Sequence, residues 1–274
     1  MTTKVSWIVG IFAILLLTLG GREFMLLPDG RVHVVFLDVG QGDSALITLP
    51  DGRQILIDGG PDWSTLEGLG KHLPFFDRHI DMLILSHPNS DHMMSFPDVL
   101  RRYSVGTLVT TGTVYDSGVY RATLSGAALR GVPLQVMYAG QTITLGSSTI
   151  EALWPPKEMP LGFNKNSNNT SLTLRFTHEG KRVLFTGDLE SIVEKTLVQA
   201  GVDLRADILK VPHHGSKSSS TIEFLKAVQP TVAVISVADD NTYGHPNADV
   251  LRRLREIGAD IRRTDESGDI ELQW

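Results

Sequence analysis

The chain has 274 residues, of which 42% are hydrophobic, and carries a formal net charge of −6 at neutral pH. This composition fits a globular protein with a full core, and the negative charge argues against a protein that simply coats nucleic acid. Because the sequence contains no cysteine, disulfides and zinc–thiolate sites are excluded, and any metal ion must be held by His, Asp, Glu or Asn.

The N-terminus differs in character from the rest of the chain. Lys4 precedes an apolar run over residues 5–19, the pattern of a signal peptide or a short membrane anchor. The run is slightly shorter than the ~20 residues that span a bilayer, and a buried N-terminal helix is the alternative. We expect residues 1–28 to be a signal peptide or anchor followed by a linker from residue 22. Residues 29–274 are then one domain outside the cytoplasm.

Apolar runs and turn signals predict the elements of the domain. In the first half, strands are predicted at 31–38, 45–49, 54–58, 81–85 and 107–111, and helices at 66–76, 96–103 and 119–130. Further strands are predicted at 134–138, 141–145, 149–153, 171–177, 182–186, 206–211 and 231–237 and near Ile261 and Ile270, with helices at 190–200, 219–228 and 248–257. Hairpins followed by alternating strands and helices favour a layered α/β sandwich with helices outside.

Histidines and aspartates follow several of these strands, where each strand ends. The candidates are His87, Asp91, His92, Asp188, His213, His214 and His245. A lone histidine is usually structural or solvated, but so many loop positions that all follow apolar strands are much less expected by chance. Imidazole and carboxylate ligands without thiolate suit zinc, manganese or iron. The sequence therefore predicts a metal site.

Two metal ions about 3.5–4 Å apart would need a bridging carboxylate and would serve phosphoester or amide hydrolysis. Asp188 is the candidate bridge, because Gly187 before it permits a close approach of the backbone. Asp38, Asp58 and Ser216 are candidates to orient an imidazole through its other ring nitrogen.

Six motifs then occur in an order that is similar to a known family. They are Leu37–Asp43 (LDVGQGD), Asp58–Gly60 (DGG), Ser86–His92 (SHPNSDH), Thr186–Asp188 (TGD), Lys210–Ser216 (KVPHHGS) and Tyr243–Pro246 (YGHP). Through them, residues 31–272 resemble the metallo-β-lactamase superfamily, and within it the hydrolase domain of ComEC-type competence proteins.

The resemblance implies a four-layer αββα sandwich that holds two divalent metal ions, zinc or manganese, at one edge of its sheets. It assigns His87 and His214 to the first ion, Asp91, His92 and His245 to the second, and Asp188 to the bridge. His213 is the alternative to His214, or else a substrate contact. Asn89 stands where the superfamily has another histidine, and Asn168, Asn169 and Ser171 stand in place of a further one.

The implied chemistry is hydrolysis by metal-bound hydroxide, with Asp91, Asp188 and His214 as catalytic residues. Asn169, Ser216, Lys217 and Tyr243 lie on motif loops and are candidates to contact substrate phosphate. The expected function is that of an extracytoplasmic phosphodiesterase or nuclease acting on DNA, which reaches a membrane through the N-terminal segment. No protein partner is evident.

Two alternatives stay open. A related extracellular branch cleaves phosphorylcholine esters, and such a pocket would need an aromatic cage, for which Trp63, Trp154, Tyr115 and Tyr120 are available. The second alternative is an inactive relative that only binds, because Asn89 and the missing histidine weaken the first metal site.

Overall fold

The computed structural model describes residues 17–159 and 166–274. Most of the predicted signal or anchor segment therefore lies outside the described residues. Within these two ranges, no helix is both long enough and apolar enough to cross a bilayer.

The first sheet has the strand order β14-β1-β2-β3-β4-β5-β6. Its strands are β1 (His33–Phe36), β2 (Ala45–Thr48), β3 (Gln54–Ile57), β4 (His79–Ile84), β5 (Ser104–Thr110), β6 (Leu134–Val136) and β14 (Ile270–Gln273). Pairing is antiparallel from β14 to β3 and parallel from β3 to β6.

The second sheet mirrors this plan with the order β13-β12-β11-β10-β9-β8-β7. Its strands are β7 (Thr142–Leu145), β8 (Ser148–Trp154), β9 (Thr173–His178), β10 (Lys181–Phe185), β11 (Ile208–Lys210), β12 (Val232–Ile235) and β13 (Asp260–Arg263). The strands from β10 to β13 are parallel, whereas β7 to β10 are antiparallel.

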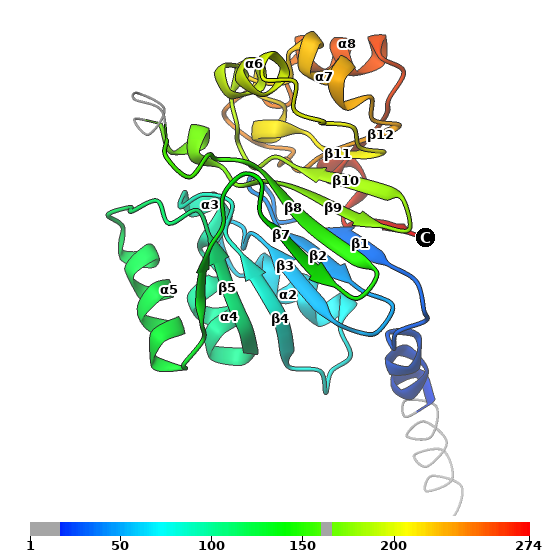
Figure 1. Ribbon diagram of the computed structural model, residues 1–274. Helices are drawn as coiled ribbons and strands as arrows, with labels where there is room; N and C mark the ends of the chain where they lie inside the picture. The colour runs from blue at the N-terminus through cyan, green and yellow to red at the C-terminus, as the bar shows by residue number, and fades with distance from the viewer. Residues whose placement is uncertain (1–16, 160–165) are drawn as a thin grey trace, which may run out of the picture.

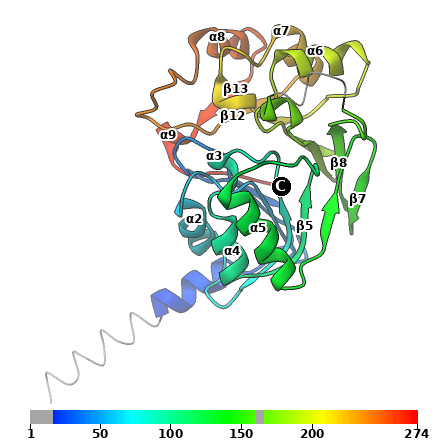
Figure 2. The same cartoon turned by 90° about the vertical axis from the view of Figure 1, so that its left-hand side faces the viewer.

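Helices cover the outer face of each sheet (Figures 1 and 2). On the first sheet they are α2 (Ser64–His72), α4 (Phe96–Arg102) and α5 (Gly118–Leu129), and on the second α6 (Ser191–Gln199), α7 (Ile222–Val228) and α8 (Ala248–Glu256). Short turns of helix connect the strands at α3 (Ser90–Met93), η2 (Ser167–Thr170), η3 (Pro212–Gly215) and α9 (Thr264–Ser267).

The apolar runs of the strands are continuous because both faces of each sheet are buried. In β10, Val183 and Phe185 pack between the sheets, while Leu184 packs under the helices of the second sheet. The sandwich of two sheets between helices predicted from the sequence is confirmed.

Element boundaries differ from the predictions where local chemistry intervenes. The helix predicted at 66–76 is α2, and its last backbone bond runs from Leu73 N to Leu69 O. Pro74 follows and has no N–H with which to continue the helix. The turns α3 and α9 were not predicted, because elements of one turn leave no periodic pattern.

Residues 17–25 form a helix where a linker was predicted from residue 22. Arg22 Nη2 donates to Gly70 O at 2.6 Å and to Lys71 O at 3.1 Å, at the C-terminal end of α2. Phe75 N donates to Glu23 Oε2 at 2.6 Å. These contacts satisfy free carbonyl groups of α2 and hold the N-terminal helix against the domain.

Candidate metal centre

The site forms where strand ends from both sheets meet. Asp58 and His87 lie in the loops that follow the parallel strands β3 and β4, and Asp188 and His213 lie in the loops that follow β10 and β11. The two edges touch where Leu172 N donates to Ser86 O at 2.8 Å. Parallel strands place their carboxyl ends on one side of a sheet, so the fold gathers these side chains.

Gly187 makes the approach of the two edges possible, as the sequence predicted. Its φ of +51° lies in the left-handed region, and a Cβ there would lie 2.9 Å from Ser171 Cβ and 3.1 Å from Ser86 Cβ. Any larger residue would push Asp188 away from the first sheet.

Asp91, His92, Asp188 and His214 form the larger of two clusters of metal-ligating groups in the described part of the chain. Their ligand atoms all lie within 4.8 Å of one another. His92 Nε2 is 3.2 Å from Asp188 Oδ1. His214 Nε2 is 3.5 Å from Asp91 Oδ2 and 3.6 Å from Asp188 Oδ2. All but Asp91 are buried.

Asp188 also faces a second set of imidazoles. Its Oδ2 lies 3.9 Å from His87 Nε2 and 3.8 Å from His213 Nε2. One carboxylate is thus shared by both sets of ligands, with Oδ1 near His92 and Oδ2 near the other imidazoles, which is compatible with the predicted bridge.

This geometry corrects how the two adjacent histidines were divided. The resemblance assigned His214 to the first ion, but its Nε2 lies with Asp91 and His92, in the second set. His213, like His87, approaches Asp188 Oδ2 but is not part of the cluster with Asp91 and His92. Both histidines adopt left-handed backbone conformations, with φ of 50° and 52°. Such strained conformations are typical of functional sites.

Unsatisfied polar atoms show that these residues fit a metal ion. The Nε2 atoms of His87, His92 and His214 and Oδ1 of Asp188 are buried, and none forms a hydrogen bond with the described residues. Leaving buried polar atoms unpaired is costly. Imidazole nitrogens and a carboxylate that converge on one volume are the donor set that zinc, manganese and iron prefer.

Asp58 holds His92 from behind, as predicted for an orienting residue. Its carboxylate accepts from Ser86 N at 2.7 Å, from Ser86 Oγ at 2.6 Å and from His92 Nδ1 at 2.8 Å. The bond to Nδ1 turns His92 Nε2 toward Asp188.

Asp58→Asn is expected to weaken metal binding roughly tenfold to hundredfold while the fold persists, because the amide cannot hold His92 as the carboxylate does. Chelator competition on the purified variant measures this affinity. Asp38→Asn is the comparison and should leave the affinity unchanged. Equal metal affinity for Asp58→Asn and the unsubstituted chain would show that Asp58 does not orient His92.

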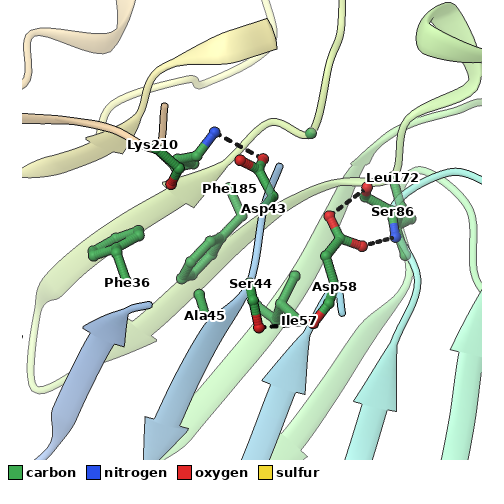
Figure 3. A pocket seen from close by; sticks show the side chains of 12 residues that line it. Phe36, Asp43, Ser44, Ala45, Ile57, Asp58, Ser86, Leu172, Phe185 and Lys210 are labelled. Carbon is green, nitrogen blue, oxygen red and sulfur yellow. Dashed lines mark hydrogen bonds and ion pairs between the residues drawn. The ribbon is translucent and has the colours of Figure 1, made fainter. Parts of the chain in front are cut away.

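Asp43 and Lys210 were not predicted as site residues, yet they join the two sheets directly behind His214. Lys210 Nζ lies 2.7 Å from Asp43 Oδ2, and both residues are buried (Figure 3). Asp43 Oδ1 is 3.3 Å from His214 Nδ1, which also lies 3.0 Å from Ser236 O. These contacts turn His214 Nε2 toward the cluster. The signal available in the sequence was a lysine inside an apolar strand, because a buried lysine needs a partner.

Beneath the cluster, Asp43, Asp58, Lys210 and Ser236 line a small cavity of about 10 Å³ between the sheets (Figure 3). Its volume is close to the minimum for one water molecule.

Burial and neighbouring charges shift the pKa values of the site residues in different directions. Burial, with the charge of His92, lowers the pKa of His87 to about 3, so His87 is neutral at pH 7. Burial opposes protonation of His214 too, but the Asp188 and Asp43 carboxylates outweigh it and raise the pKa of His214 to about 9. Burial would raise the pKa of Asp188, but the charges of His92 and His214 hold it well below its usual range. A metal ion that binds His214 would therefore compete with a proton for its Nε2.

Other predicted residues lie further out. Asn89 donates to Asn168 Oδ1 at 2.9 Å and accepts from Ser167 Oγ at 2.7 Å, so its amide is engaged with the loop of η2. The resemblance assigned His245 to the second ion, but the structure does not place it in the cluster with Asp91 and His92. It stands beside His213, with 5.6 Å between ring centroids, and its buried Nδ1 forms no hydrogen bond with the described residues.

The predicted substrate contacts divide by exposure. Asn169 and Ser216 are buried, and Asn169 Oδ1 has no hydrogen-bond partner among the described residues. Lys217 and Tyr243 are exposed, and the Tyr243 ring stacks on His245 with 5.7 Å between centroids.

The prediction that Asp38 orients an imidazole of the site is wrong, because the structure does not bring Asp38 to the cluster. Its side chain is exposed and accepts only a long bond from Gly40 N at 3.4 Å, while its backbone N–H is held by Asp269. Asp38 follows β1, which has antiparallel neighbours on both sides, and Asp58 follows β3, at the start of the parallel half.

Two sheets between helices, with histidines and aspartates gathered at the strand ends, define a metal-dependent hydrolase of the metallo-β-lactamase fold. A family model described as "Beta-lactamase superfamily domain" matches residues 53–234, and the chain belongs to this superfamily.

Among curated proteins, the chain is similar to ComE operon protein 3 of Bacillus subtilis (strain 168), at 30% identity over 91% of this chain and 34% of that protein. It is also similar to Competence protein ComA of Neisseria gonorrhoeae, at 32% identity over 89% of this chain and 33% of that protein. The chain thus spans about a third of the length of these relatives.

Among solved structures, the metallo-beta-lactamase fold protein YhfI from Bacillus subtilis superposes with a TM-score of 0.59 at 13% identity. The match covers 89% of this chain and 100% of that one. At this identity the likeness concerns the fold alone.

Proposed function

We propose that the chain is a phosphodiesterase that acts on DNA with two divalent metal ions, zinc or manganese. The observation that carries the proposal is the set of buried, unpaired ligand atoms gathered on both sides of Asp188. The name of the similar Competence protein ComA points to the state in which cells take up DNA, which supports a DNA substrate.

In this proposal, His87 and His213 with Asp188 hold one ion, and Asp91, His92 and His214 with Asp188 hold the other. Bound ions of this kind lower the pKa of water and polarise a phosphoryl oxygen.

The chain's own residues orient the reaction. Asp58 and Asp43 fix the imidazoles of His92 and His214. Asp91 is the partly exposed member of the cluster, and its carboxylate would accept a hydrogen bond from the attacking water. Lys217, exposed just beyond the His213–His214 turn, is a point-charge donor for phosphate.

The proposal includes an extracytoplasmic location. The apolar run at residues 5–19, which follows Lys4, would export or anchor the domain.

The phosphorylcholine alternative gains less support from the geometry. Of its four candidate cage aromatics, Trp154 and Tyr120 are buried. Trp154 Nε1 donates to Asn169 O at 2.7 Å, and Tyr120 Oη donates to Thr113 O at 2.9 Å. These two rings serve packing, which leaves Trp63 and Tyr115 at the surface.

The deciding experiment measures bound metal in the purified 274-residue chain, then turnover of bis-p-nitrophenyl phosphate and single-stranded DNA with added manganese or zinc. Metal-dependent cleavage of DNA is expected. Cleavage of small esters alone would favour the alternative hydrolase. Folded protein with neither metal nor turnover would leave a binding protein.

Lys217→Ala is expected to weaken DNA binding equally for all sequences and to reduce the salt dependence of binding by about one phosphate contact. Binding of labelled single-stranded DNA across a salt series measures the slope. Lys226→Ala is the matched control, since Lys226 is an exposed lysine on α7. An unchanged slope for Lys217→Ala would show that Lys217 does not contact a DNA phosphate.

A further inference from the structure

Exposed apolar side chains gather around the helix at residues 17–25 and the loop after α2. Each has about half or more of its area exposed, and they are Leu17, Leu19, Phe24, Met25, Phe75 and Phe76. Single exposed apolar residues are ordinary, but a group of six on neighbouring segments marks an interaction surface.

Specific hydrogen bonds hold the segments of this surface together. Arg22 and Glu23 fix the helix against α2 and the backbone of Phe75. Between the helix and the domain, a pocket of about 490 Å³ is lined largely by apolar groups, including those of Leu19, Leu73 and Phe75. The domain therefore holds the helix by its polar contacts and leaves its apolar side chains uncovered.

Basic groups frame the same surface. The Arg78 guanidinium lies 5.3 Å from the centre of the Phe75 ring and 5.4 Å from that of Tyr103. Lys71 and Arg22 stand at the C-terminal end of α2. Aromatic rings beside lysine and arginine are the composition that settles at the boundary between lipid headgroups and acyl chains.

We propose that the surface formed by residues 17–25 with Phe75 and Phe76, which we call the apolar face, rests on a lipid bilayer. The apolar run at residues 5–19 leads directly into this helix, and Leu17 and Leu19 belong to both. This continuity selects a membrane over a protein partner. The inference rests on the membrane location within the proposed function and is independent of the reaction.

The apolar face and the metal centre lie at opposite ends of β4. Phe75 and Phe76 precede the start of β4, whereas His87 follows its end. β4 has six residues, so at about 3.3 Å per residue it separates the apolar face from the metal centre by roughly 20 Å. The site then opens away from the lipid, toward substrates in solution.

The test labels the 274-residue chain at single cysteines, which is possible because the sequence has none. Phe76→Cys reports on the apolar face, and Val114→Cys is the matched control. Val114 is 89% exposed against 67% for Phe76, and it follows β5 at the opposite end of the sheet. Each variant carries an environment-sensitive fluorophore and is mixed with vesicles of phosphatidylcholine and phosphatidylglycerol.

The Phe76 label is expected to shift its emission to shorter wavelength and to be quenched by doxyl-labelled lipid, whereas the Val114 label should keep its spectrum in water. A chain that sediments with the vesicles while its Phe76 label stays in water would overturn the apolar face alone. Quenching of both labels would overturn it too. A chain that does not sediment would overturn both the face and the membrane location, without bearing on hydrolysis.

Discussion

Asp188→Asn is expected to abolish stable binding of both metal ions and to lower phosphodiester turnover roughly a thousandfold. The amide keeps the shape of the side chain but loses the charge that stands between the two sets of ligands. Metal ions supply several kcal/mol of transition-state stabilisation. Since about 1.4 kcal/mol corresponds to a factor of ten in rate, losing ~4 kcal/mol costs about three orders of magnitude.

Bound metal and bis-p-nitrophenyl phosphate turnover are measured on the same preparation. Asp260→Asn is the control, because Asp260 is an exposed carboxylate on β13 that pairs with Arg262. Full metal content and full turnover in Asp188→Asn would remove Asp188 from the bridging role and the proposed mechanism with it.

Lys210→Met should lower the free energy of unfolding by about 3–5 kcal/mol. Burial opposes ionisation of Asp43, but Lys210 and His214 outweigh it and hold the pKa of Asp43 below its usual range. Removing Lys210 leaves a buried carboxylate without its main partner, and breaking a buried ion pair from one side has this large cost.

Urea unfolding in the presence of a chelator isolates this effect from metal binding. Lys217→Met is the matched control, since the same substitution at an exposed position should change stability by less than about 0.5 kcal/mol. The double variant Asp43→Asn with Lys210→Met should recover much of the loss. A single Lys210→Met variant as stable as the control would contradict the buried pair.

The strands and the position of Asp188 were predictable from sequence because each leaves a local signal. Strands buried on both faces appear as continuous apolar runs. Asp188 follows such a run directly after a glycine that the close approach of the two sheets requires.

The division between His213 and His214 had no such signal. Both follow β11, and which imidazole reaches Asp91 is decided by two successive left-handed residues. The Asp43–Lys210 pair joins the two sheets across a long stretch of sequence. Only the tertiary fold brings its members together, although a lysine in an apolar strand indicated that a buried partner was needed.

The pairing of β1 with β14 has a consequence for how the chain folds. His33 is registered with Gln273, and Val32 N donates to Trp274 O at 2.9 Å. One edge of β1 therefore stays open until residues 270–274 have been made, and contacts this distant in sequence form slowly. An open strand edge invites pairing with other chains, so newly made protein should need protection from aggregation.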